Sequence, residues 1–424
     1  DLELKAANEG YRIERGGVGY GVEPRMPMEN GLRFAGHIPY FSWSAWEETL
    51  YPTNNAQPLF ATEGSSISQF FDVDVDDLEV FGFRLTDVAL QASNSAQGWT
   101  LHAESPQAAG SMFVPSVISS SPLVMDLERL HLESNDATRQ QADLNPREMP
   151  AFRISASRFS FDGINFGHLK LEADRIAQGL RLNTLELDDR NTRVEANGDW
   201  LAMPDSQTSR FRIHVDSKNL GKALHQWGYA GTFEDGRTNI DIIASWPGTP
   251  TQFALEKLDG TFKIRVENGR LLDVEPGAAR VFGLLSLQAL PRRLTLDFSD
   301  MFAKGFAFDQ IVGQFEIKNG RADTDGLLME GPSARIISRG RIGLADRYYD
   351  QVVAVTPRLG DSLPLLGAAA LGPQVGATVL VMQKLFEKQL NEISTVQYSV
   401  TGSWRDPTIR RIEQPPPSSD DLFE

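Results

Sequence analysis

The sequence predicts a mainly β protein: a repetitive, strongly curled antiparallel β-sheet that forms an elongated apolar groove, with two short helical segments near its C-terminal end. Three observations lead to this fold class. Apolar and polar residues alternate with a period of two along most of the chain, which is typical of strands with one apolar and one polar face. Asn-Gly and Asp-Gly pairs, the usual hairpin turns, separate many of these runs. Similar strand patterns recur in units of about 40 residues.

Strands are expected where the alternation is clearest, for example at residues 211–216, 262–267 and 396–401. In each run the apolar side chains project from one face of the strand. Together with those of similar runs nearby, they are the candidates for the lining of the apolar groove: Phe211, Ile213, Val215, Ile240, Ile242, Phe262, Ile264, Val266, Phe315, Ile317, Tyr398 and Val400. Hairpin turns are expected at Asp162-Gly163, Asn197-Gly198, Asp259-Gly260, Asn268-Gly269 and Asn319-Gly320.

A repeated pattern indicates that the sheet is assembled from similar units. A strand that ends in Trp and is soon followed by Pro occurs three times, at Trp200, Trp246 and Trp404. Residues 159–200 also resemble residues 306–344. Units of a few strands that pack on their neighbours are typical of repetitive β architectures.

The polar segments suggest how the chain is divided. We expect groove repeats in residues 1–132, a polar linker at 133–150, further groove repeats at 151–275, a C-terminal region at 276–412 and a disordered tail at 413–424. The helical segments are expected at about residues 276–290 and 362–393. Because the chain begins with Asp1 in a strand-like run, we expect it to be a fragment of a longer protein, without its anchor.

The composition excludes several classes of function. A formal net charge of -16 argues against broad nucleic-acid binding, which needs clustered Lys and Arg. The absence of cysteine from the sequence removes thiol catalysis, disulfides and Cys-based zinc sites. The six histidines lack metal-ligand spacing, and the run GGVGYG at residues 16–21 lacks the order of a dinucleotide-binding loop. The sequence therefore predicts no enzyme, with no catalytic residues, no metal and no cofactor.

One acidic run leaves two interpretations open. Residues 72–77 read DVDVDD, which alternates like a strand. Oxygen ligands of this kind can bind calcium, but a solvated strand face explains the pattern as well and is favoured.

Residues 361–390 contain a stretch of 22 residues without a charge, between Asp361 and Lys384. Gly372-Pro373 is expected to break it into two helical pieces. Three interpretations remain open: a core helix that caps the sheet, a segment that contacts or enters a membrane, and a full span, which the Gly and Pro residues disfavour. The candidates for membrane contact are Leu363, Leu365, Leu366, Leu371, Val375, Val379, Met382 and Phe386.

The predicted sheet has more apolar surface than the predicted helices can cover. Each strand with one apolar face needs that face removed from water. Either a second sheet closes over the first, as in a sandwich, or the sheet curls into a trough whose lining faces an apolar ligand. Because the same pattern repeats along the whole chain with so little covering material, the trough is favoured.

The segment from Trp246 to Leu344, and above all LPRRLTLDFSDMFAKGFAFD at residues 290–309, resembles the C-terminal region of the YhdP-type, AsmA-like proteins of the Gram-negative envelope. The resemblance is strongest over residues 246–411 and moderate over 152–200. This family is similar to the bridge-like lipid transfer proteins. The resemblance therefore implies a long, curled β-sheet trough with an apolar lining, and it carries over no catalytic or binding residue.

The function that the resemblance implies is phospholipid transport across the periplasm, with acyl chains sliding along the groove between the inner and outer membranes. It also implies an inner-membrane anchor, absent here, and an outer membrane at the C-terminal end. The alternative is an outer-membrane assembly or scaffold protein that holds a protein partner in the groove, because an open sheet can pair with an incoming strand. A glycan-cleaving β-solenoid is disfavoured by the apolar faces.

Overall fold

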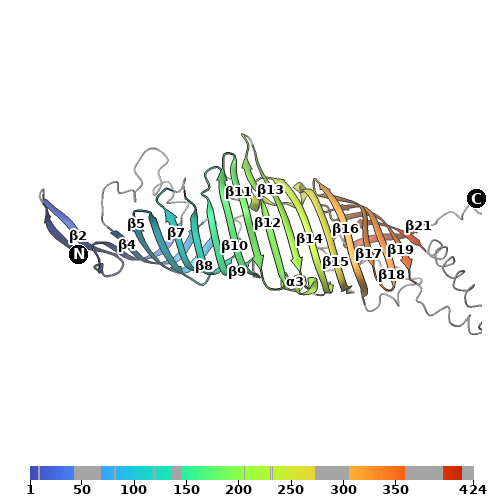
Figure 1. Cartoon of the computed structure of the whole chain (residues 1–424), viewed down its shortest axis with the longest axis horizontal. Coiled ribbons are helices and arrows are strands. Elements are labelled where there is room, and N and C mark those ends of the chain that lie inside the picture. Colours follow the sequence, from blue (N-terminus) through green and yellow to red (C-terminus); the bar gives the residue numbers. More distant parts are fainter. Residues whose placement is uncertain are drawn as a thin grey trace, which may run out of the picture. The chain divides into compact units, whose positions relative to one another are not determined.

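The computed structural model describes residues 1–7, 10–42, 68–80, 83–117, 121–134, 145–204, 206–229, 231, 233–272, 305–358 and 395–412 (Figure 1). The prediction of a mainly β fold is confirmed: the described residues form 21 strands that belong to one sheet. By their internal contacts the residues form two compact units. Unit 1 comprises Asp1–Phe211 and Pro247–Phe253, and unit 2 comprises Arg212–Trp246 and Ala254–Glu424.

Unit 1 is built almost entirely from strands that follow one another along the chain. They are β1 (Leu2–Ala7), β2 (Gly10–Tyr20), β3 (Gly31–Ser42), β4 (Ser68–Val80), β5 (Phe83–Ser95), β6 (Gly98–Glu104), β7 (Ala108–Pro115), β8 (Leu123–Leu132), β9 (Phe152–Phe161), β10 (Ile164–Ile176), β11 (Gly179–Asp188) and β12 (Thr192–Ala202). The next strand, β13 (Gln207–Ser217), contributes residues to both units.

Most neighbouring strands of unit 1 are antiparallel, as predicted, but three described pairs are parallel: β2 with β3, β3 with β4, and β8 with β9. A parallel pair requires the chain to return to the starting end of the strand, which needs a longer connection than a hairpin. The segment between β8 and β9 provides such a connection, and it contains the polar stretch of residues 133–150. Alternation along a strand reports its two faces and not its direction, so the sequence pattern could not reveal these pairs.

Unit 2 continues the same construction with antiparallel pairs. Its strands are β14 (Phe233–Pro247), β15 (Asp259–Leu271), β16 (Phe306–Lys318), β17 (Arg321–Glu330), β18 (Ala334–Gly343), β19 (Tyr348–Pro357), β20 (Val396–Ser403) and β21 (Asp406–Ile412). Each strand from β14 to β20 pairs with the next along the chain. Two short 3-10 turns, η1 (Pro250–Gln252) and η2 (Leu255–Lys257), connect β14 to β15.

One short helix, α3 (Leu220–Gln226), packs on unit 2 and was not predicted from the sequence. Asn219 caps its N-terminus, because its side chain accepts a hydrogen bond from the backbone N–H of Lys222 at 2.9 Å. Leu220, Ala223 and Leu224 are buried. With only seven residues, the helix is too short to show an apolar period in the sequence.

Two of the five predicted turns are confirmed. Asp162-Gly163 and Asn319-Gly320 form tight hairpin turns in which both residues have positive φ, 49° and 76° in the first and 48° and 69° in the second. Such left-handed pairs match the twist of the adjoining strands.

The other three predicted turns are wrong, because these residues lie inside strands. Asn197-Gly198 lies in β12, where a side chain at residue 198 would collide with the carbonyl of Arg210 and the ring of Phe211. Asp259-Gly260 begins β15, and Asn268-Gly269 lies within it. Asn268 has a φ of 53° within the strand, and glycine at 269 leaves room for the ring of Phe308. Glycine in these strands serves close packing instead of chain reversal.

The glycine-rich run at residues 16–21 also has a packing role. The backbone of residues 22–25 passes directly over Gly17 and Gly19, where a side chain would meet the backbone of Arg25 or of Val22. The glycines therefore allow the backbone of residues 22–25 to pack closely against β2. The run lies at the end of a strand and does not begin a helix.

Several predictions concern residues outside the described part of the chain. These are the helical segments at 276–290 and 362–393, the eight candidates for membrane contact between Leu363 and Phe386, and the tail at 413–424. Among the described residues, no helix is both long enough and apolar enough to cross a membrane.

Candidate functional site

The register of the strands brings most of the predicted groove residues of unit 2 onto one face. Ile240 lies opposite Ile264, Ile242 opposite Phe262, and Phe262 opposite Phe315, whose ring centroids are 6.0 Å apart. Directly opposed residues of an antiparallel pair project from the same face of a sheet. Val266 and Ile317 join this face through their positions in the same strands, and Tyr398 and Val400 through the pairing of β19 with β20.

A continuous row of side chains crosses this face from strand to strand. We call it the unit 2 row; it consists of Val266, Ile311, Met329, Ile336, Val355 and Val396, each directly opposite the next. Within the row, only Val266 was among the predicted groove residues, and Ile311, Met329, Ile336, Val355 and Val396 were not. Their strands also alternate, but those runs contain glycine and charged residues that obscure the pattern.

The three predicted residues of β13 also belong to the apolar side. The ring of Phe211 packs over Gly198, whose neighbours Ala196 and Trp200 face the apolar side of unit 1. In unit 2, His214 bonds to Asp241, which lies between Ile240 and Ile242 and so faces the opposite way. Ile213 and Val215 flank His214, and alternation therefore places them on the same side as Ile240 and Ile242.

Unit 1 carries an equally continuous row that was not among the predicted groove residues. We call it the unit 1 row; it consists of Phe34, Phe71, Ala92, Leu101, Met112, Met125, Ile154, Leu171, Leu185 and Ala196, which lie opposite one another from β3 to β12. Phe34 and Phe71 stack with their ring centroids 4.9 Å apart. A second set beside the row, Leu127, Ala156 and Leu169, forms a buried cluster. The alternation in these strands was the signal that could have identified the row.

The two rows differ in their access to solvent. In unit 2, Val266, Ile311, Met329 and Val355 are each 0% exposed. In unit 1, the row is half-buried at every position from Phe34 to Leu185, and only Ala196 at its end is buried. The unit 1 row therefore has apolar surface still open to a ligand.

Helix α3 accounts for the burial at one end of the unit 2 row. A side chain at Gly236 would lie 2.9 Å from Val266 and 3.6 Å from Leu220, so helix and row meet at this glycine. Glycine at 221 likewise allows the helix to approach the backbone of β14 closely. Val266, predicted as a groove residue, thus lies beneath a covering helix.

The apolar face of unit 2 also contains polar groups. Ser338, 1% exposed, lies between Leu327 and Val353, and its hydroxyl has no hydrogen-bond partner among the described residues. Gln351, 2% exposed, is opposite Gly340 and Val400. Thr324 donates a hydrogen bond to the carbonyl of Gln314 at 2.7 Å.

The opposite face of the sheet is lined with ion pairs. In the acidic run of β4, Asp72 faces Arg33 at 3.5 Å and Asp76 faces His37 at 3.2 Å. Asp77 lies in register with the residues of the apolar side, and it pairs with Arg84 at 2.6 Å near the end of the strand. The hydrogen bond from Arg84 lowers the pKa of Asp77. These pairs fit the solvated-face interpretation, and the described residues contain no group of His, Asp and Glu arranged to hold a metal ion.

His214 is the most strongly paired histidine of this face. Its Nδ1 lies 2.7 Å from an oxygen of Asp241, and its Nε2 lies 2.9 Å from an oxygen of Asp216. The hydrogen bond to Asp241, followed by that to Asp216, raises the pKa of His214 above its usual value. The arrangement favours a protonated imidazole held between two carboxylates.

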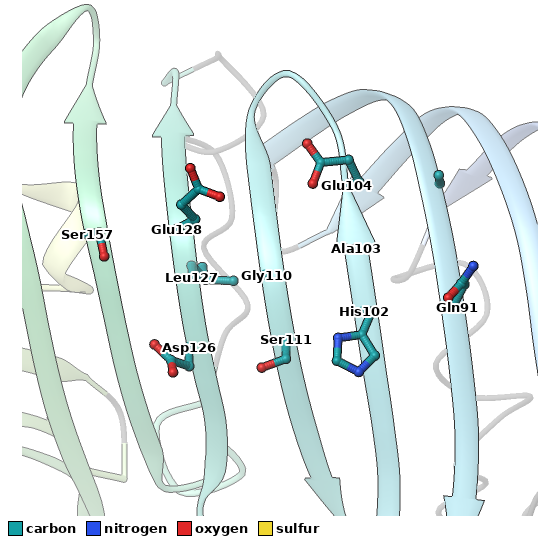
Figure 2. A pocket seen from close by; sticks show the side chains of 11 residues that line it. Gln91, His102, Ala103, Glu104, Gly110, Ser111, Asp126, Leu127, Glu128 and Ser157 are labelled. Carbon is teal, nitrogen blue, oxygen red and sulfur yellow. The ribbon is translucent and has the colours of Figure 1, made fainter.

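Unit 1 has a polar hollow of about 630 Å³ on this same outer face (Figure 2). Gln91, His102, Ser111 and Asp126 cross it in a row, each from a different strand. Ser111 is opposite both His102 and Asp126, so the serine separates the other two. In a Ser-His-Asp triad the histidine lies in the middle, between serine and carboxylate. These three residues therefore do not have the arrangement of such a triad.

Comparison with known proteins agrees with the sequence resemblance. The family model described as "YhdP protein" matches residues 1–409. The "Intermembrane phospholipid transporter YhdP" of Escherichia coli (strain K12) is 27% identical over 274 residues, which is 64% of this chain and 22% of the relative. No solved structure matches the chain. Because the family match extends over nearly all of the sequence, the chain belongs to the YhdP protein family.

Proposed function

We propose that this chain forms part of a phospholipid path between the inner and outer membranes, with acyl chains lying against the apolar face of the sheet. The observation that carries the proposal is the unit 1 row, in which one half-buried apolar side chain follows another from β3 to Leu185 in β11. The name of the E. coli relative, an intermembrane phospholipid transporter, supports the choice of ligand. The chain spans 22% of the length of that relative, so it would supply one section of the path.

The energetics explain why a continuous row suffices. Burying one methylene contributes about 0.8 kcal/mol, so exposing a sixteen-carbon chain to water costs roughly 12 kcal/mol. A lipid that moves along the row exchanges one apolar contact for another and avoids most of this cost. Because the barrier is one of solvation, the path needs no nucleophile, base or metal, and we infer that the chain is not an enzyme.

The two faces of the sheet differ in polarity, and only the inner face suits acyl chains. In unit 1 the inner face offers leucine, methionine and phenylalanine, whereas the outer face carries paired charges such as Arg153 with Asp174 at 2.6 Å. We propose that the acyl chains occupy the inner face and the headgroups remain in water at its margin. We also propose that the chain acts in the periplasm, with an inner-membrane anchor elsewhere in the protein and an outer membrane at its C-terminal end; the name of the E. coli relative supports a path between membranes.

Photo-cross-linking at adjacent residues of β8 tests the path. Met125 lies in the unit 1 row, and Val124, its neighbour, projects from the opposite face and is 38% exposed. A photoreactive amino acid at residue 125 is expected to capture phospholipid in cells, and the same group at residue 124 is expected to capture little. Equal labelling at both residues, or capture of a protein at 125 instead of lipid, would overturn the proposal.

A further inference from the structure

The C-terminal strands of unit 2 have a charge opposite to that of the chain. Residues 334–358 and 395–412 contain eight arginines and three aspartates, with no lysine and no glutamate. The chain as a whole has a formal net charge of -16. Strands β18 to β21 are therefore a basic region in an acidic protein.

The outer face of these strands combines arginine with apolar side chains. Arg339, Val352, Ser399 and Arg410 form one row across β18 to β21, and Ile337, Ala354, Gln397 and Ile412 form the next. Val352 is 43% exposed and Ile412 is 36% exposed, although this face elsewhere carries charged residues. We call Ile337, Arg339, Val352, Ala354, Arg410 and Ile412 the outer patch.

The two arginines of the outer patch are available for a ligand. On the same strands Arg335 pairs with Glu330 at 3.7 Å and Arg341 with Asp323 at 3.1 Å. Within the described part of the chain, neither Arg339 nor Arg410 has an ion-pair partner, and both are exposed. An exposed arginine without a partner is free to contact an anion such as phosphate.

The spacing of the arginines indicates what kind of anion they meet. Arg339 and Arg410 are three strand separations apart, which corresponds to about 14 Å. This is too far for both to hold one phosphate, but it suits a surface on which anionic groups recur. The exposed valine and isoleucine between and beside them suit the boundary between headgroups and acyl chains. In the described pairings β21 joins only β20, so the patch extends to an edge of the sheet.

We propose that the outer patch docks this end of the protein onto a membrane surface containing anionic phospholipid. The inference rests on the proposed function, because a lipid path must meet a membrane, but it concerns the outer face and not the apolar row. The arginines would contact lipid phosphates, and Val352 and Ile412 would enter the interface. The contact belongs to the surface of a bilayer and does not require a span.

Vesicle binding of the whole chain tests the proposal. We would measure sedimentation with vesicles of phosphatidylcholine alone and of phosphatidylcholine with phosphatidylglycerol. Near an anionic membrane each basic residue contributes roughly a fivefold gain in binding, so neutralising two is expected to weaken binding roughly 10- to 30-fold. The variant is Arg339→Gln with Arg410→Gln, and binding of the unchanged protein is expected to fall at high salt.

A matched control removes the same charge from the same face of unit 2. Lys263 and Arg265 are exposed residues of β15, distant from the outer patch in strand order. Lys263→Gln with Arg265→Gln is expected to retain binding to within about twofold. Circular dichroism would establish that both variants are folded. Equal binding by the two variants, or equal binding to both kinds of vesicle, would overturn the proposal. It would also be overturned if nucleic acid displaced the vesicles and bound through the same residues, Arg339 and Arg410.

The outcome also separates the two proposals. If the outer-patch variant loses vesicle binding but still cross-links lipid through residue 125, both proposals stand. If vesicle binding does not depend on the patch while cross-linking persists, only the docking surface is wrong. If residue 125 captures no lipid in any variant, the path is wrong, whatever the vesicles show.

Discussion

At the scale of single residues, His214 should make the stability of the fold depend on pH. Because Asp241 and Asp216 raise its pKa in the folded state, protonated His214 stabilises the fold. This stabilisation is fully present below the unfolded pKa of about 6.5 and is lost as the pH rises through the higher folded value. His214 is 36% exposed, so the effect should be small, at most about 1 kcal/mol. Urea unfolding on both sides of this range should show the decline, and His214→Gln should remove it.

A single variant checks the cause of the shift. Asp241 is the first contributor to the raised pKa of His214. Asp241→Asn should therefore return the pKa toward its usual value, which an NMR titration of the imidazole would report. An unchanged titration would show that Asp241 is not the cause.

Gly198 shows how a residue can mislead sequence analysis. Asn197-Gly198 has the composition of a hairpin turn, yet it lies in β12, where residue 198 is glycine because Phe211 and the Arg210 carbonyl leave no room for a side chain. Gly198→Ala should therefore destabilise unit 1 by roughly 1–3 kcal/mol. Gly326 is a suitable control, because a side chain there would meet no atom within 4 Å. Chemical unfolding of both variants would test this, and equal stabilities would contradict the packing explanation.

At the scale of elements, α3 is held by packing. Leu224 is 2% exposed and Ala223 1% exposed, whereas Lys222 points to solvent. Leu224→Ala should destabilise unit 2 by roughly 2–5 kcal/mol, and Lys222→Ala should change it by less than about 0.5 kcal/mol. Hydrogen exchange should then show faster exchange in β15 beside Val266 for the first variant only. Unchanged protection there would mean that the helix does not cover the row.

The elements also show what alternation can and cannot predict. It assigned faces correctly, since Ile240, Ile264 and Phe315 do lie on one side of unit 2. It could not predict the parallel pairs of unit 1, because a strand has the same two faces whichever way it runs. The unit 1 row was also missed, because it includes the small side chains of Ala92 and Ala196, which make the apolar positions of their strands less obvious in the sequence. The burial of individual residues could not be predicted either, because the pattern shows which face of a strand is apolar but not which other element covers it.

At the scale of the whole molecule, the proposed path implies that sites along it act in series. In unit 1, Leu101 and Leu185 lie on opposite sides of Met125 and Ile154 in the same row. Charges at the middle of the row would interrupt the apolar contact that a moving acyl chain requires. A lipid that enters from one side should then reach the first of the two outer sites and fail to reach the second.

The prediction uses a double variant, Met125→Asp with Ile154→Asp, and photoreactive residues at 101 or 185. Lipid capture should persist at one of these positions and fall at least about tenfold at the other. An acyl chain placed against two carboxylates loses the apolar contacts of Met125 and Ile154 and also desolvates the charges. Val124→Asp, on the opposite face of β8, should leave capture unchanged at both. The position that loses lipid would identify the side from which lipid arrives. Undiminished capture at both would mean that lipids bind to the row without travelling along it.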